Sequence, residues 1–138
     1  MTEASAVLPV EVIYLGLAIV VGLATIALQG LVADLAFGLR WGAGPRDHRP
    51  DDGNLLLQRL ERTNSNFAET FPFFAAGVLG CIILDRTGTG TAWGTALYFW
   101  ARVAYVPLYA FGVPWLRSIA WFVSIFGIIL VTLPLFGL

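Results

Sequence analysis

The chain has 138 residues, of which 58% are hydrophobic and only 12% are charged, whereas roughly 25% are charged in an average soluble domain. Its formal net charge of −1 excludes a strongly basic surface, and with it the usual electrostatic basis of nucleic-acid binding. The apolar residues stand in long continuous runs, so the composition predicts an integral membrane protein folded as one domain.

The charged and sulfur-containing residues narrow the possible sites further. All eight cationic residues are arginine, so an anion site in this chain must be built from planar guanidinium groups. The single cysteine, Cys81, lies inside an apolar run, which excludes an intrachain disulfide and a cysteine metal cluster. We interpret it as a small buried hydrophobic residue.

The first apolar segment predicts a membrane helix over about residues 12–40, with several glycines and alanines that allow close helix contact. No positive charge precedes it, so we expect a retained span and not a cleaved signal peptide. The polar stretch 42–54 is rich in Gly, Pro and Asp, which is typical of a loop. Asp52 or Asn54 is expected to cap the next helix.

Three further helices are predicted over about residues 55–84, 92–110 and 116–135. Pro72 is expected to kink the first of these just past Glu69. The fold class is therefore an all-α membrane protein, a bundle of four transmembrane helices. Most arginines flank the first and third loops, so the positive-inside rule predicts that both loops are cytoplasmic and that both termini lie outside.

Polar side chains recur at helical spacing inside two of these spans. Arg62, Asn66 and Glu69 share one face of the second helix. The third helix carries Arg102, Tyr105 and Tyr109 on one face, and antiparallel packing brings both sets to a similar depth. Because a charge facing lipid costs roughly 2.5–3.5 kcal/mol even on the most lenient scale, these groups are expected to face protein or water.

Two interpretations of this cluster are open. In the first, Glu69 serves only to pin the bundle by pairing with Arg62 or Arg102, and the tyrosines form an interfacial aromatic belt. Alternatively, the surplus of positive donors over one buried carboxylate predicts an anionic ligand with carboxylate and amide groups. The residues of the predicted cluster are Arg40, Arg62, Asn66, Glu69, Arg102, Tyr105, Tyr109 and Arg117.

Two motifs give the chain a family resemblance. They are R-x-N-x-N-x-x-E-x-x-P-F over residues 62–73, and R-V-A-Y-x-x-x-Y followed by P-W-L-R-S within residues 102–118. The sequence resembles the MAPEG family, the membrane-associated proteins in eicosanoid and glutathione metabolism, in a bacterial-type form and over all four spans. The resemblance implies a single domain over residues 1–138, a homotrimer and a location in the bacterial inner membrane.

The same resemblance implies that glutathione binds as cosubstrate between neighbouring protomers near the cytoplasmic face. It assigns glutathione contacts to Arg62, Asn66, Glu69, Tyr105, Tyr109, Arg117 and Ser118, with Arg40 matched by location only, and Arg102 joins this set from the cluster above. Arg117 is the residue expected to be catalytic, since the matching arginine in the family's synthases stabilises the glutathione thiolate.

The chain departs from the family's eicosanoid synthases at four positions, Asn64, Ser65, Tyr105 and Trp121. These departures argue against eicosanoid synthesis. The leading hypothesis is a membrane glutathione transferase or peroxidase acting on apolar electrophiles or lipid hydroperoxides. The alternative is a non-catalytic lipid-binding protein or accessory subunit of a larger membrane complex; a small transporter has less support, since no pair of broken helices is present.

Overall fold

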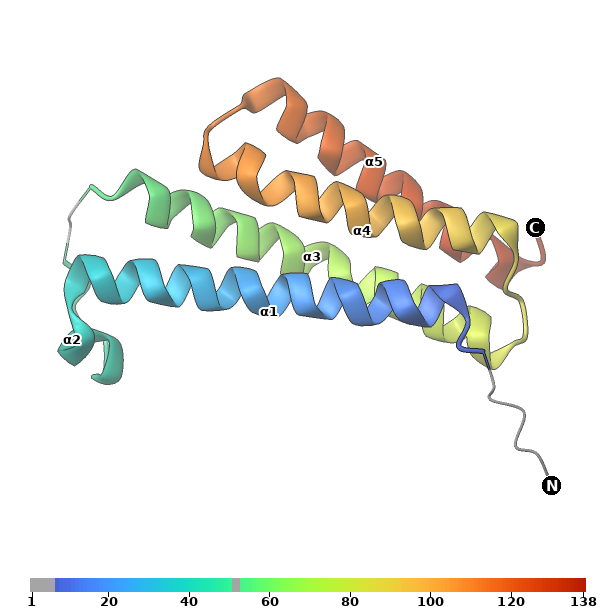
Figure 1. Cartoon of the computed structure of the whole chain (residues 1–138), viewed down its shortest axis with the longest axis horizontal. Helices are drawn as coiled ribbons and strands as arrows, with labels where there is room; N and C mark the ends of the chain where they lie inside the picture. Colours follow the sequence, from blue (N-terminus) through green and yellow to red (C-terminus); the bar gives the residue numbers. More distant parts are fainter. Residues whose placement is uncertain (1–6, 51–52) are drawn as a thin grey trace.

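The computed structural model describes residues 7–50 and 53–138, which fold into four long helices and two short ones (Figure 1). The long helices α1 (Val10–Phe37), α3 (Leu55–Ile83), α4 (Thr89–Ala110) and α5 (Pro114–Thr132) run alternately in opposite directions. The short α2 (Leu39–Ala43) follows α1, and a 3₁₀ helix, η1 (Leu133–Phe136), continues α5. The start of α1 and the end of η1 therefore lie at the same end of the bundle (Figure 1).

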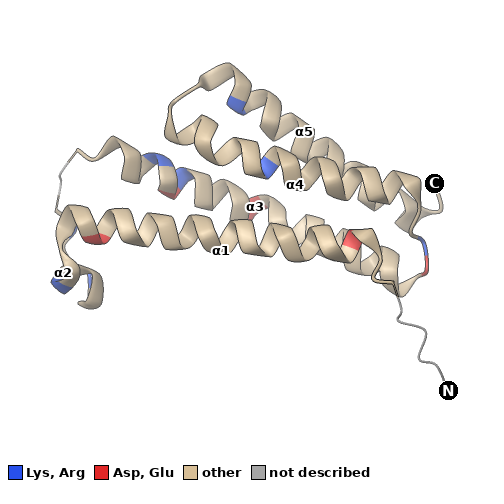
Figure 2. Cartoon of the chain, in the orientation of Figure 1, with Lys and Arg blue, Asp and Glu red and all other residues tan. Residues whose placement is uncertain are grey.

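Three of these helical segments are long and apolar enough to cross a membrane: α1, α3, and α5 together with η1. Charged residues are sparse along them (Figure 2). The fourth long helix, α4, falls outside this group because threonines, glycines and Arg102 lower its apolar character. The protein is thus all-helical with three candidate spans, and the fourth span of the sequence analysis remains a prediction.

The helix ends follow from local chemistry. The Asn54 side chain accepts a hydrogen bond from the Leu57 N–H at 3.0 Å and caps α3, whereas Asp52 lies outside the described residues. The first helix ends at Phe37 and not near residue 40, because Gly38 has φ of 87° and turns the chain into α2. The α4 helix starts at Thr89, since the Thr91 hydroxyl accepts from the Gly88 N–H at 2.8 Å.

The helices enclose a core in the middle of the bundle. Phe74 of α3 and Tyr98 of α4 stack with ring centroids 3.9 Å apart, and both are fully buried beside Val131 of α5. A polar contact joins α1 to α3, where the Asn64 amide donates to the side chain of Gln29. Because a bilayer supplies no water, such polar groups are satisfied most favourably inside the protein.

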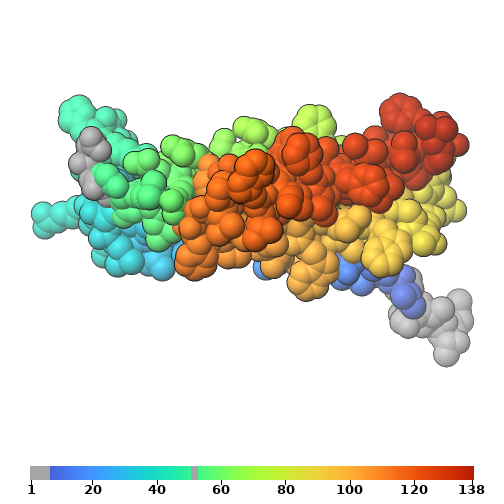
Figure 3. Space-filling model, turned by 90° about the horizontal axis from the view of Figure 1, so that it is seen from above, coloured from blue at the N-terminus to red at the C-terminus, as the bar shows by residue number. Residues whose placement is uncertain are grey.

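The helices α4 and α5 approach most closely at two facing glycines. A Cβ atom built on Gly94 would lie 2.8 Å from the Gly127 carbonyl oxygen, and one on Gly127 would lie 2.6 Å from the Gly94 carbonyl oxygen. Only hydrogen at both positions permits this separation, which is how small residues hold membrane helices together. Seen from above, α5 (orange to red) covers much of one face of the molecule (Figure 3).

Replacing Gly127 with alanine is therefore expected to lower the free energy of unfolding by about 1–3 kcal/mol, because the new methyl group would force the two backbones apart. Thermal unfolding in detergent, followed by circular dichroism, measures this loss. Gly90→Ala on α4 is the matched control, since nothing lies within 4 Å of its Cβ position. Equal melting temperatures for the two variants would contradict the close glycine contact.

Candidate functional site

Arg102 of α4 lies at the junction of three helices and is 2% exposed. Its guanidinium donates to the Asn66 side-chain oxygen of α3 at 2.6 Å and to the Ser124 hydroxyl of α5 at 2.8 Å. The rings of Tyr98 and Tyr105 lie 5.2–5.4 Å from the guanidinium carbon. Within residues 7–50 and 53–138, this buried cation is thus held by neutral partners, and no carboxylate is paired with it.

The Arg102 Nε–H has no hydrogen-bond partner and is the one fully buried side-chain polar atom among the described residues in that state. It leaves one of the five N–H donors of the guanidinium unused. Because one terminal nitrogen of the guanidinium donates to the Asn66 side-chain oxygen, Arg102 fixes the orientation of the Asn66 amide. In the single chain, Arg102 therefore acts as a positioning residue for Asn66.

A hollow of about 260 Å³ opens beside this junction, near the α4–α5 loop. It is lined by Asn66, Tyr105, Tyr109, Arg117, Ser118, Trp121 and Phe122. Five of these seven residues belong to the set predicted from the sequence. The helices α3, α4 and α5 therefore bring these five predicted residues to one place.

The cation of this hollow is Arg117, which is half-buried in the first turn of α5. Its guanidinium carbon lies 4.6 Å from the centroid of the Tyr109 ring, a cation–π contact that leaves its N–H donors available. Among the described residues, no carboxylate forms an ion pair with Arg117. This arrangement suits an incoming anion.

Two predicted residues of α3 do not line the hollow. Arg62 and Glu69 are both exposed, and neither forms a hydrogen bond or ion pair with the described residues. The expectation that Glu69 is a buried carboxylate is wrong for the single chain, and so is its pairing with Arg62 or Arg102. Helical spacing places Arg62, Asn66 and Glu69 on one face of α3, but of these three only Asn66 lies deep enough to contact α4.

Arg40 also lies apart from the hollow. It is exposed in the short helix α2 and lines a separate depression formed by residues 40–48. The turn at Gly38 separates α2 from α1, so this single chain does not bring Arg40 to Arg117. At the same end of the bundle, Arg59 donates to the Ala110 carbonyl at 3.0 Å and so terminates α4.

Sequence reasoning missed Ser124 as a member of this junction. The signal was present, because Ser124 lies seven residues after Arg117 and thus on the same face of α5. Its hydroxyl accepts from Arg102 and donates to the Trp121 carbonyl at 2.7 Å. A second missed residue, Glu11, is buried at the opposite end of the bundle.

These features define a class: an all-helical protein with membrane-length helices, whose polar residues converge on a cationic hollow at one end of the bundle. The family model of the MAPEG family matches residues 14–137. The chain therefore belongs to the MAPEG family, a group of membrane proteins linked to glutathione and eicosanoid metabolism. Comparison with curated proteins and comparison with solved structures each returned no match.

Arg102→Met tests the junction, because methionine keeps much of the apolar length but has no donors. We expect it to reduce the free energy of unfolding by about 1–3 kcal/mol, since Asn66 and Ser124 lose their partner. Thermal unfolding in detergent measures the effect, and Arg46→Met on the exposed first loop serves as the control. If both variants unfolded like the wild type, Arg102 would not join the helices as described.

Proposed function

We propose that this protein is a membrane-bound glutathione transferase or peroxidase, in which Arg117 activates the thiol of glutathione. The observation that carries the proposal is the convergence of Asn66, Tyr105, Tyr109, Arg117 and Ser118 on one hollow. Membership of the MAPEG family supports glutathione as the thiol. Catalysis and the identity of the cosubstrate are parts of the proposal.

The donors around the hollow match the chemistry of a tripeptide with two carboxylates. The Arg117 guanidinium is suited to bind a carboxylate or a thiolate, because it carries a permanent charge and several N–H donors. The Ser118 hydroxyl already donates to the Pro114 carbonyl at 3.1 Å, and its oxygen remains an acceptor. The Asn66 amide, oriented by Arg102, supplies a polar group for a peptide bond.

The proposed chemistry begins with the thiol. A guanidinium beside the sulfur stabilises the thiolate, lowers the pKa of the thiol and raises the nucleophilic fraction at neutral pH. In conjugation, the thiolate sulfur attacks an electrophilic carbon, the carbon–sulfur bond forms, and a leaving group such as chloride departs. In peroxide reduction, two glutathione molecules become the disulfide while the hydroperoxide becomes an alcohol and water.

Apolar substrates have a direct route to this hollow. Trp121 and Phe122 line it from α5, and Phe122 is 65% exposed on the outer face of the bundle. An electrophile dissolved in the bilayer would therefore meet the hollow through its aromatic edge. This favours hydrophobic second substrates such as lipid hydroperoxides.

The exposed charges of α3 support assembly with further copies of the chain. Arg62 and Glu69 lie on a helix that is a candidate span, and a charge facing lipid is unfavourable. A neighbouring protomer packed on this face would cover both residues. We infer a homotrimer, in which Arg62, Glu69 and also Arg40 would reach glutathione across the interface.

The membrane arrangement follows from the same proposal. We infer that α4 is the fourth span, because it lies within the bundle, where Arg102, Thr91 and Thr95 are shielded from lipid. The arginines flanking the first and third loops favour a cytoplasmic position for the hollow. In a bacterial cell, this would place the protein in the inner membrane with both termini outside.

Arg117→Ala is expected to lower kcat/KM for conjugation of a chlorinated nitrobenzene by about 10- to 100-fold at pH 7, because the thiol loses the cation that favours its ionisation. Activity of the variant should recover partly as the pH rises, since more thiolate then forms without help. Turnover assays across pH, with calorimetry of glutathione binding, measure both effects.

The matched control is Arg46→Ala, which removes an exposed arginine that makes no contact with the hollow. Wild-type protein that neither binds glutathione nor turns over an electrophile would contradict the proposal. Glutathione binding without turnover would instead support a non-catalytic binding protein or an accessory subunit of a larger membrane complex.

The trimer is tested by native mass spectrometry of the detergent-solubilised protein. We expect a mass of three chains for the wild type, and partial dissociation for Arg62→Ala and Glu69→Ala, since both side chains are proposed to lie in the interface. Glu61→Gln is the control, because Glu61 pairs with Arg49 within the same chain at 2.7 Å. A monomeric wild type would refute the assembly.

A further inference from the structure

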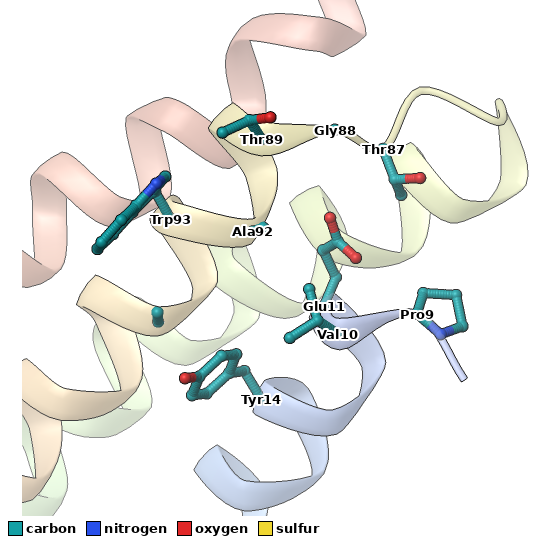
Figure 4. A pocket seen from close by; sticks show the side chains of 10 residues that line it. Pro9, Val10, Glu11, Tyr14, Thr87, Gly88, Thr89, Ala92 and Trp93 are labelled. Atoms are coloured by element: carbon teal, nitrogen blue, oxygen red, sulfur yellow. The ribbon is translucent and has the colours of Figure 1, made fainter. Parts of the chain in front are cut away.

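A second and larger cavity, which is wide open to the outside, lies at the opposite end of the bundle, between the start of α1 and the start of α4 (Figure 4). Its volume is about 720 Å³, within the range of roughly 300–1,000 Å³ that holds small organic ligands. It is lined mainly by apolar and aromatic groups together with Glu11, and its main members are Val10, Tyr14, Thr89, Ala92, Trp93 and Ala96. From Thr91 to Tyr105, α4 rises about 21 Å, so this cavity is separate from the Arg117 hollow.

Among the described residues that line this cavity, Glu11 is the one acid, and it is 3% exposed. Figure 4 shows its side chain extending from the first turn of α1 toward the start of α4. Among the described residues, its one hydrogen bond comes from the Thr91 hydroxyl, with 2.6 Å between the oxygens. That hydroxyl also lies 2.8 Å from the Gly88 carbonyl, so a single proton is shared between two acceptors.

The Glu11 carboxylate also lacks a cationic partner within residues 7–50 and 53–138, where Arg49–Glu61 is the one ion pair. The arginine of the α3–α4 loop, Arg86, is committed elsewhere, because it donates to the Pro134 carbonyl of η1 at 2.8 Å. A buried charge without a counter-ion is costly in a protein and more so near lipid. The structure thus retains an acid that a bound cation would stabilise.

The other residues that line the cavity also suit a bound cation. The rings of Tyr14 and Trp93 lie to one side of Glu11 (Figure 4), and aromatic faces attract ammonium groups. Val10, Ala92 and Ala96 add apolar surface for a hydrocarbon or aryl tail. The described lining contains no arginine, so an anionic ligand would have no positive partner there.

We propose that this cavity binds an organic cation, a protonated amine with an aryl or alkyl tail, through an ion pair with Glu11. The ammonium group would donate to the Glu11 carboxylate between the N-terminal ends of α1 and α4. The tail of the ligand would lie along Ala92 and Ala96. This site is independent of glutathione and of the Arg117 hollow, so neither proposal depends on the other.

Isothermal calorimetry on the full chain in neutral detergent tests the site, with protein-free micelles as the blank. The probe is 4-phenylbutylamine, compared with its neutral alcohol and its carboxylate analogue. We expect saturable binding of the amine at least tenfold tighter than that of either analogue. Glu11→Gln should weaken amine binding at least tenfold and leave glutathione binding unchanged.

Glu61→Gln on the exposed face of α3 is the matched control and should bind the amine like the wild type. Ala92→Phe fills the cavity without altering Glu11, and it should also abolish amine binding; it decides the matter if Glu11→Gln does not fold. No saturable binding, equal binding of the three probes, or unchanged binding in Glu11→Gln or in Ala92→Phe would overturn the proposal.

Discussion

The hydrogen bonds of the Arg102 guanidinium are the interaction on which the arrangement of the helices most depends. One buried side chain links α4 to Asn66 of α3 and to Ser124 of α5, while the rings of Tyr98 and Tyr105 flank its charge. In a soluble protein, water would compete for these donors. Inside a membrane bundle no such competitor is available, so the partners must come from neighbouring helices and thereby fix their register.

The polar groups of the two ends of the bundle differ in sign. In the part of the chain that the structure describes, Arg117 lies at one end in a hollow with tyrosines and no paired acid, and Glu11 lies at the other end in a cavity with no paired base. Between them the core is apolar, built around the Phe74–Tyr98 stack. The proposed anion site and the proposed cation site therefore lie at opposite ends of the bundle.

Much of the fold and part of the site could be predicted from the sequence. The length and composition of the apolar segments identified the long helices. Helical spacing placed Tyr105 and Tyr109 on one face of α4, and both residues line the hollow. Spacing alone could not tell which residue of a polar face meets a neighbouring helix, so Asn66 was grouped with Glu69 although only Asn66 reaches Arg102. The burial of Glu11 was not predicted, because burial at the start of a helix depends on how α1 and α4 pack against each other. No local sequence pattern indicates that packing. The break at Gly38 likewise depends on a positive φ, and glycine permits that conformation without requiring it.

The facing glycines of α4 and α5 have a mechanical consequence. Gly94 and Gly127 hold the two backbones together near one end, and the helices diverge toward the loop that joins them (Figure 1). Tyr109 lies about 22 Å along the axis of α4 from this contact. A tilt of a few degrees about the glycines as a fulcrum therefore displaces the loop end by an ångström or more while leaving the contact itself intact. A small tilt about this contact would therefore have its largest effect at the loop end, beside Arg117 and the aromatic edge of the hollow.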